Sequence, residues 1–259
     1  MNAALTLWNK HMRKSMSNPE EAIGMLIQPV LWVVLFGVGM GSLLGATEPG
    51  AENTYITFML PGIITLTALG GAIGGGTEWL NERLQGIVKE YLAAPIPRMS
   101  ILFGNAFSAM TKSLMQAVVI MIVGVIIGAK LSNNPLGWLG GLLLVAGYGL
   151  GFSGIAIAVA SKTDSPGGYH MLIFMLNLPL LFLSNALYPL QTMPSWMEFA
   201  ARINPTTYVV SGMRLMTFGA GQAFAKADAI PIWLCFLVVV IFLAVGMTLG
   251  YRAFRSSLA

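Results

Sequence analysis

Long uncharged stretches separated by short polar connections dominate the pattern of hydrophobic and polar positions in this chain. Five of them contain no Asp, Glu, Lys or Arg: residues 22–44, 55–77, 113–129, 131–161 and 229–251. A helix needs roughly 20 apolar residues to cross the hydrocarbon core of a bilayer. Each stretch therefore predicts a membrane-spanning helix.

A sixth uncharged stretch covers residues 165–197, which is too long for one crossing. As a single helix it would measure about 50 Å, and Pro179, Pro189 and Pro194 would break it. We interpret it as one span over residues 167–186, followed by a short segment that re-enters the outer half of the membrane.

The expected fold class is an all-α polytopic membrane protein with a single transmembrane domain over residues 1–259. Its predicted parts are an interfacial helix (1–18), six transmembrane helices (22–45, 55–80, 101–129, 136–161, 167–186 and 229–252), a cytoplasmic loop with a short helix (81–98) and extracellular re-entrant helices (187–220). Hydrophobic residues make up 56% of the chain and charged residues only 9%, compared with roughly a quarter charged in soluble domains. This composition excludes a water-soluble fold.

The distribution of charge predicts the orientation of the chain in the membrane and excludes one class of partner. The 14 basic residues are scattered singly, which excludes nucleic-acid binding as a main activity because no dense patch follows phosphates. Nine bases fall on the side of the N-terminus: Lys10, Arg13, Lys14, Arg83, Lys89, Arg98, Lys162, Arg252 and Arg255. Four fall on the other side: Lys130, Arg202, Arg214 and Lys226. Lys112, near the inner end of the third span, is not counted. The positive-inside rule then predicts that both termini are cytoplasmic. The single cysteine, Cys235, excludes an intramolecular disulfide framework.

The N-terminal segment 3–17 is amphipathic as a helix. Its apolar face carries Leu5, Trp8, Met12 and Met16, and its bases Lys10, Arg13 and Lys14 point away from that face. This pattern favours a helix in the inner headgroup layer, with its bases over anionic lipid. A plain positive-inside anchor is the alternative.

The inner loop 81–98 is the longest charged stretch. Its apolar residues recur at the helical spacing i, i+3, i+4, i+7 and i+8: Leu84, Ile87, Val88, Tyr91 and Leu92. Polar residues fill most other positions, and Pro95 and Pro97 end the pattern. We predict one short amphipathic helix that presses into a groove on a cytoplasmic partner. The alternative is a helix that only floats on lipid.

Residues 186–220 form neither a full span nor a polar loop. The stretch Leu187–Pro194 turns sharply, residues 195–199 are rich in aromatics, and Asn204–Tyr208 starts a second short helix. Backbone broken inside a membrane persists only where protein or water covers it. We therefore expect this segment to cap a pathway or cavity. An aromatic loop resting on the outer leaflet is the alternative.

Parts of the sequence also fit two other classes of function. Gly151–Gly154 looks like the Gly-x-Ser-Gly of rhomboid proteases, and His170 could approach Ser153 as the base that activates it, although the rhomboid pattern places another span between them. An ion-coupled secondary transporter would place ionisable groups near mid-membrane. Only Glu78 and Lys112 come close to that depth, and we expect both near the inner ends of their spans. No G-x-x-x-x-G-K-[ST] motif is present, so ATP chemistry must come from another subunit.

Three motifs together carry a family resemblance. They are the inner loop from Glu82 to Arg98, the outer pair Tyr188–Pro194 and Asn204–Tyr208, and Leu60-Pro61-Gly62 early in the second span. In this combination, and over nearly its whole length, the chain resembles the type 2 ABC transporter permeases, and most closely the drug-efflux and NodJ-like branch of bacterial exporters. One departure is an inner loop that ends in Pro-x-Pro-Arg where Pro-x-Ser-Arg is frequent in that family.

The resemblance implies a permease of the bacterial inner membrane that pairs as a homodimer and binds two copies of a separate ATP-hydrolysing subunit. ATP and Mg²⁺ would be held by that partner, and this chain would bind no cofactor. The inner loop would form the coupling helix. The residues expected to dock the ATP-hydrolysing subunit are Glu82, Arg83, Gly86, Lys89, Glu90 and Leu92. The residues expected to form the outer gate are Tyr188, Pro189, Pro194, Asn204, Pro205 and Tyr208.

The expected cargo is amphiphilic. The spans offer Met, Phe and Leu with few polar groups, which suits a drug, a lipid or a glycolipid-like molecule better than a long hydrophilic polymer. Export as the direction of transport follows from the resemblance alone.

Overall fold

The computed structural model describes residues 2–17, 19–47, 51–94, 96–130, 132–217 and 230–256. These residues fold into helices joined by short turns, and no strand occurs among them. The helices are α1 (Asn2–Ser17), α2 (Pro19–Thr47), α3 (Ala51–Leu84), α4 (Ile87–Ala93), α5 (Arg98–Ile127), α6 (Pro135–Lys162), α7 (Pro166–Phe182), η1 (Leu190–Thr192), α8 (Ser195–Ile203), α9 (Pro205–Thr217) and α11 (Ile232–Ser256). The predicted all-α class is confirmed.

Four of the described helices are long and apolar enough to cross a membrane: Tyr55–Leu84, Arg98–Ile127, Pro135–Lys162 and Ile232–Ser256. Two shorter apolar segments, Leu26–Gly39 and Pro166–Phe182, lie where the first and fifth spans are predicted. The chain is therefore a polytopic membrane protein, whereas six as the number of spans stays a prediction.

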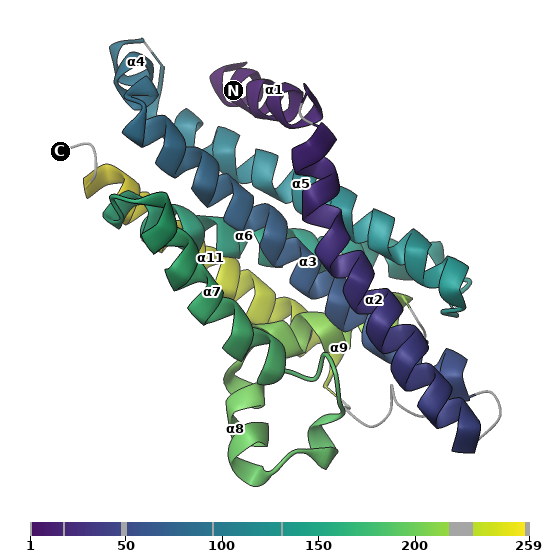
Figure 1. The fold of residues 1–259 in the computed structure, drawn as a ribbon. Helices are drawn as coiled ribbons and strands as arrows, with labels where there is room; N and C mark the ends of the chain where they lie inside the picture. Colours follow the sequence, from purple (N-terminus) through teal and green to yellow (C-terminus); the bar gives the residue numbers. More distant parts are fainter. Residues whose placement is uncertain are drawn as a thin grey trace.

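The long helices form a bundle with the short helices at its two ends (Figure 1). α1 and α4 lie at the same end, where α11 also ends, and α8 lies at the opposite end (Figure 1). α3 runs through the centre and contacts α2, α5, α6 and α7. The main core lies where α3 meets α5 and α6, and its largest fully buried side chains are Met59, Leu60, Ile64, Leu69, Ile120, Leu144 and Tyr148.

Three long helices contain an internal proline: Pro29 in α2, Pro61 in α3 and Pro179 in α7. Proline has no N–H, so each helix lacks one backbone hydrogen bond at that turn. The helices α5, α6 and α11 contain no proline beyond their first turn. The bundle is thus made of three interrupted and three continuous helices.

Glycines bring α6 and α11 into direct backbone contact. A Cβ added at Gly246 would overlap the carbonyl oxygen of Gly151, and one added at Gly154 would overlap the carbonyl oxygen of Gly246. Lipid tails are as apolar as the side chains of a helix, so van der Waals packing of this kind is the main force that joins helices in a bilayer. The contact makes α6 and α11 a closely fitted pair.

We predict that Gly246→Ala destabilises the protein by about 1–3 kcal/mol, the usual cost of overpacking. The added methyl group meets backbone, which cannot move aside alone. Gly39→Ala in α2 is the matched control, because nothing lies within 4 Å of its Cβ position. Thermal unfolding in detergent should show a lower Tm for Gly246→Ala only. Equal Tm values for the two variants would contradict the close fit.

Candidate functional site

The stretch 81–98, predicted as a loop with one short amphipathic helix, contains the last turn of α3 and the separate helix α4. α3 continues to Leu84, and α4 begins at Ile87. Gly86 between them has φ = 79°, a left-handed conformation that glycine adopts without a steric penalty. Glu82 and Arg83 therefore belong to the last turn of α3, whereas Lys89 and Glu90 belong to α4. Among the predicted loop residues, Pro95 and the side chain of Leu92 lie outside the described residues.

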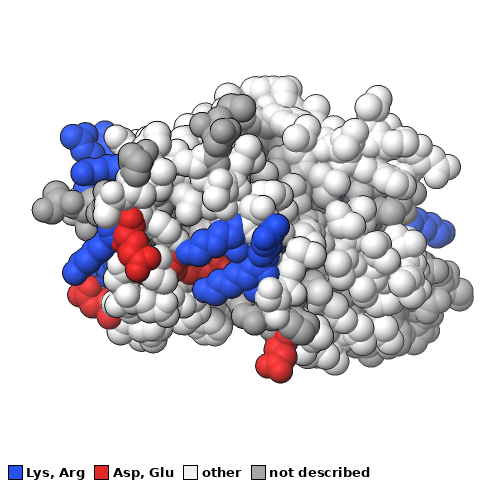
Figure 2. Space-filling view, turned by 90° about the horizontal axis from the view of Figure 1, so that it is seen from above, with Lys and Arg blue, Asp and Glu red and all other residues white. Residues whose placement is uncertain are grey.

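α4 is attached by one side and open on the other. Val88 is buried in a cluster with Leu7 of α1 and Trp79 of α3. Lys89 and Glu90 are exposed. Charged side chains gather over the part of the surface where α1 and α4 lie, and most of the rest of that face is uncharged (Figure 2). The open side of α4 thus presents one base and one acid to the surroundings.

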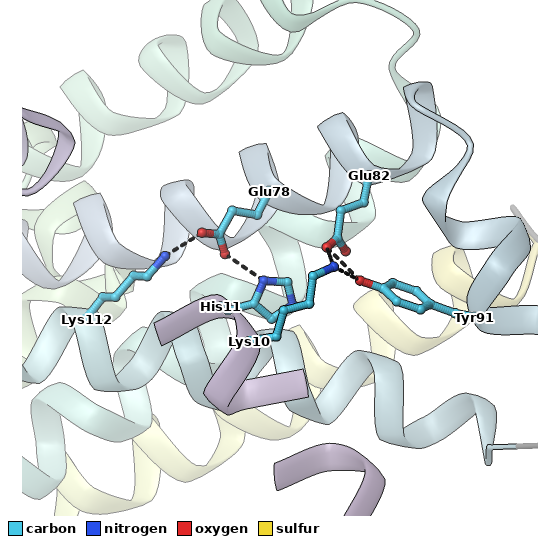
Figure 3. Close-up of polar contacts among 6 residues, drawn as sticks. All are labelled: Lys10, His11, Glu78, Glu82, Tyr91 and Lys112. Carbon is cyan, nitrogen blue, oxygen red and sulfur yellow. Dashed lines mark hydrogen bonds and ion pairs between the residues drawn. The ribbon is translucent and has the colours of Figure 1, made fainter. Parts of the chain in front are cut away.

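One carboxylate joins α1, α3 and α4 (Figure 3). Glu82 Oε1 accepts hydrogen bonds from Lys10 Nζ at 2.9 Å and from Tyr91 Oη at 2.8 Å. Lys10 Nζ also donates to Tyr91 Oη and lies 4.9 Å from the centre of that ring. Glu82 itself is only 4% exposed. Glu82 therefore holds α4 and α1 in place, and its role in docking a partner stays a prediction.

The proton positions in this triad follow from its burial. Burial raises the pKa of Tyr91 to about 12, so the phenol keeps its proton and donates to the carboxylate. Burial lowers the pKa of Lys10, but the hydrogen bonds to Glu82 and Tyr91 outweigh that effect and raise it above the usual value. Lys10 is therefore a cation and Tyr91 a neutral donor at physiological pH.

A second carboxylate lies one turn earlier in α3 (Figure 3). Glu78 Oε1 accepts a hydrogen bond from Lys112 Nζ of α5 at 2.5 Å, and Glu78 Oε2 lies 3.4 Å from Nδ1 of His11 in α1. All three side chains are buried. The sequence places Glu78 and Lys112 near the inner ends of their spans, but it does not predict that they pair. The one signal in the sequence is Lys112, a single base in the otherwise uncharged stretch 99–129.

Burial lowers the pKa of His11 below 6.5, against the opposite effect of Glu78 and Glu82. His11 is thus neutral at pH 7. We name the six side chains Lys10, His11, Glu78, Glu82, Tyr91 and Lys112 the polar junction. It connects α1, α3, α4 and α5 through two buried carboxylates.

Arg83 points away from the polar junction. Its guanidinium donates to the carbonyl oxygen of Ser161 at 2.5 Å and to that of Thr163, and it pairs with the exposed Asp164 at 3.2 Å. These carbonyls end α6, where a base offsets the partial negative charge of a helix C-terminus. Arg83 therefore links α3 to the α6–α7 connection.

The predicted outer-gate residues lie together at the other end of the bundle, where they bind helix ends. Asn204 Nδ2 donates to the carbonyl oxygens of Leu180 and Leu183 at the end of α7, and its Oδ1 accepts from the N–H of Thr206 in α9. Tyr188 and Tyr208 donate to the carbonyl oxygens of Phe182 and Arg202. Pro189, Pro194 and Pro205 directly precede or open η1, α8 and α9. Re-entry into the membrane stays a prediction.

Arg214 fixes this outer segment to the bundle, a role that the sequence does not reveal. Counted above as one of four bases outside the membrane, it is buried in α9. Its guanidinium donates to the carbonyl oxygens of Phe58 and Asn185 at 3.1 and 3.0 Å and lies 4.0 Å from the Phe58 ring centre. The segment therefore packs on α3.

A groove of about 410 Å³ opens between α2, α3 and α7. Most of its lining is apolar, with Trp32 and Leu66 on α2 and α3 and Phe174 on α7. Pockets of roughly 300–1,000 Å³ accommodate drug-sized ligands. This groove is the candidate cargo site.

The protease alternative finds no support in the geometry. Ser153 is fully buried, and its Oγ has no hydrogen-bond partner. His170 is exposed on α7, and no hydrogen bond joins the two residues. A serine nucleophile needs a base within hydrogen-bond reach. The part of the chain that the structure describes also contains no group of three His, Cys, Asp or Glu side chains that could hold a metal.

We predict that Glu78→Gln destabilises the protein by about 3–5 kcal/mol, because it leaves the buried Lys112 ammonium without a counter-charge. The double variant Glu78→Gln/Lys112→Met should recover most of this loss. Lys130→Met, which removes an exposed base at the opposite end, is the control. Denaturant or thermal unfolding measures the difference. A single variant as stable as the wild type would show that the pair is dispensable.

We also predict that α1 binds the bundle less tightly in acid. In released α1, His11 takes up a proton near pH 6.5, whereas burial lowers its pKa when α1 is docked. Docking is therefore fully favoured above about pH 6.5 and weakens as the pH falls below that value. In a Cys235→Ala background, maleimide should label Leu7→Cys increasingly from pH 7.5 to 5.5, relative to the exposed Leu5→Cys. His11→Gln should abolish the trend, and a flat ratio in the parent would contradict it.

Comparison with known proteins agrees with these features. The ABC-2 type transporter family matches residues 2–218. The ycf38 transport permease of Cyanophora paradoxa is 31% identical over 248 residues, which cover 92% of this chain and 84% of the relative. The daunorubicin resistance ABC transporter permease protein DrrB1 of Streptomyces coeruleorubidus is 24% identical, with 85% and 76% covered. The inner membrane transport permease YadH of Escherichia coli K12 is 20% identical, with 93% and 90% covered. The chain is a multi-pass membrane protein that belongs to the ABC-2 type transporter permease family.

Proposed function

We propose that this chain is the transmembrane subunit of an ATP-driven exporter that moves an amphiphilic cargo out of the cytoplasm or the inner leaflet. ATP is hydrolysed by a separate subunit that holds ATP and Mg²⁺. Two copies of the permease pair and bind two copies of that subunit in a bacterial inner membrane, with both termini cytoplasmic. The observation that carries the proposal is α4, a short helix with exposed charges that is attached to two other elements through the polar junction.

α4 suits the transmission of movement because of how it is held. A partner that pushes on Lys89 and Glu90 displaces Tyr91, which is hydrogen-bonded to Glu82 of α3 and to Lys10 of α1. Gly86 supplies the bend between α4 and α3. The residues that we assign to docking therefore divide into two groups. Lys89 and Glu90 meet the partner, and Glu82, Arg83 and Gly86 support them.

The cargo is proposed from the groove and from the relatives. A lining that is mostly apolar accepts hydrocarbon or aromatic bodies. DrrB1 is named for daunorubicin resistance, which supports efflux of an amphiphilic small molecule. Transport coupled to protons or other ions has less support, because Glu78 and Lys112 neutralise each other in the described structure.

We predict that Lys89→Glu weakens binding of the ATPase subunit about tenfold, a loss of about 1.4 kcal/mol. Reversing an exposed charge at an interface puts like charges together and leaves the intrachain contacts of Glu82 and Tyr91 intact. Lys130→Glu is the matched control, because it reverses an exposed base at the other end of the bundle, after α5. Tagged permease from native membranes should retain its ATPase subunit in the wild type and in Lys130→Glu, but lose much of it in Lys89→Glu. Wild-type ratios in Lys89→Glu would show that α4 only rests on the membrane surface.

A further inference from the structure

The groove between α2, α3 and α7 contains polar groups but no charge. Among the described residues that line it there is no Asp, Glu, Lys, Arg or His. Its polar side chains are Gln28 of α2, Thr67 of α3 and Asn177 of α7. The rest of the lining is apolar or glycine. A cargo in this groove therefore meets amides and a hydroxyl, and no ion.

These three polar residues lie at a similar depth. Thr67 is eleven residues from Glu78 in α3, and Asn177 is eleven residues from Pro166 at the start of α7. Gln28 is nine residues from Pro19, the first residue of α2. At about 1.5 Å per residue, Thr67 lies roughly 16–17 Å along α3 from Glu78 of the polar junction, Asn177 lies roughly as far from the first residue of α7, and Gln28 lies roughly 14 Å from the first residue of α2. Each distance is about half of a hydrocarbon core of about 30 Å.

The two amides are not used by the described fold. The Thr67 hydroxyl donates to the carbonyl oxygen of Ile63 at 2.7 Å. The side chains of Gln28 and Asn177, in contrast, make no hydrogen bond with another described residue. A polar group without a partner in hydrocarbon costs free energy. Gln28 is exposed and Asn177 is half-buried, so both amides are open to a partner that enters the groove and removes this cost.

We propose that Gln28 and Asn177 select an uncharged amphiphile as the cargo. This inference rests on the proposed function, in which the groove binds a molecule for export. The amides hydrogen-bond a hydroxyl, carbonyl or amide of the cargo, and Trp32 and Phe174 contact its aromatic or acyl body. A cationic amphiphile, such as the amine drug for which DrrB1 is named, is disfavoured in this chain because it would lose its hydration in the groove and find no carboxylate there.

The test uses two fluorescent amphiphiles with the same aromatic body and acyl chain, one ending in a primary carboxamide and the other in trimethylammonium. Binding to the purified permease in lipid nanodiscs is followed by quenching of Trp32 fluorescence, with Trp32→Phe as the background. The wild type should bind the carboxamide probe at least about tenfold more tightly. Gln28→Leu and Asn177→Leu should each weaken that binding about tenfold, the effect of one hydrogen bond.

Two further variants sharpen the test. Gln191→Leu makes the same chemical change at an exposed site in η1 and should leave probe binding unchanged. Asn177→Asp, measured at pH 9 to ionise the carboxyl group, should reverse the preference in favour of the trimethylammonium probe. Equal affinity of the wild type for both probes overturns the proposal, as does unchanged carboxamide binding in both Leu variants.

Another occupant of the groove would leave a different signature. If the amides pair with a second copy of the chain, the Leu variants would lower the dimer fraction in native mass spectrometry while probe binding stays constant, which refutes cargo selection. The proposed function is tested separately by retention of the ATPase subunit. A permease that keeps this subunit but prefers neither probe remains an exporter subunit with another basis for selectivity.

Discussion

Burying a carboxylate in a membrane protein is tolerated only when its charge is met, and this constraint shapes the α4 end of the bundle. Glu78 and Glu82 lie one turn apart in α3, and both are buried. Glu78 pairs with Lys112 and lies beside His11, and Glu82 accepts hydrogen bonds from Lys10 and Tyr91. Separating a carboxylate from its partner would leave a buried charge without a counter-charge, which costs several kcal/mol. α1, α4 and α5 therefore have one favourable position relative to α3.

The same constraint acts on backbone groups at the opposite end. The chain between α7 and α9 turns several times, and each turn leaves carbonyl oxygens without a helical partner. Asn204 and Arg214 supply donors for three of them, the carbonyl oxygens of Leu180, Leu183 and Asn185. A polar side chain at a broken helix thus donates the hydrogen bonds that the next helical turn would otherwise supply. Irregular backbone persists there for this reason.

Local sequence patterns predict much of this protein, whereas contacts between residues far apart in the chain could not be predicted from them. The uncharged runs indicated the apolar helices because hydropathy is a local property of each segment, and Asn204-Pro205 marked the start of α9. The pairing of Glu78 with Lys112 joins positions 34 apart and depends on the rotation of α3 against α5, which no local pattern contains. For the same reason Arg214 was counted as a base in water. The apolar spacing from Leu84 to Tyr91 continued across Gly86, so periodicity alone did not show the break.

The internal prolines have a consequence for where the bundle can bend. Pro29, Pro61 and Pro179 interrupt α2, α3 and α7, and these are the same three helices that line the groove. At each proline the hydrogen bond that would resist bending is already absent. α6 and α11 instead meet backbone to backbone along their glycines. Resistance to bending is therefore uneven. α6 and α11 form a stiff pair, whereas each of the three helices around the groove has a weak point, so the width of the groove can change without separating α6 from α11.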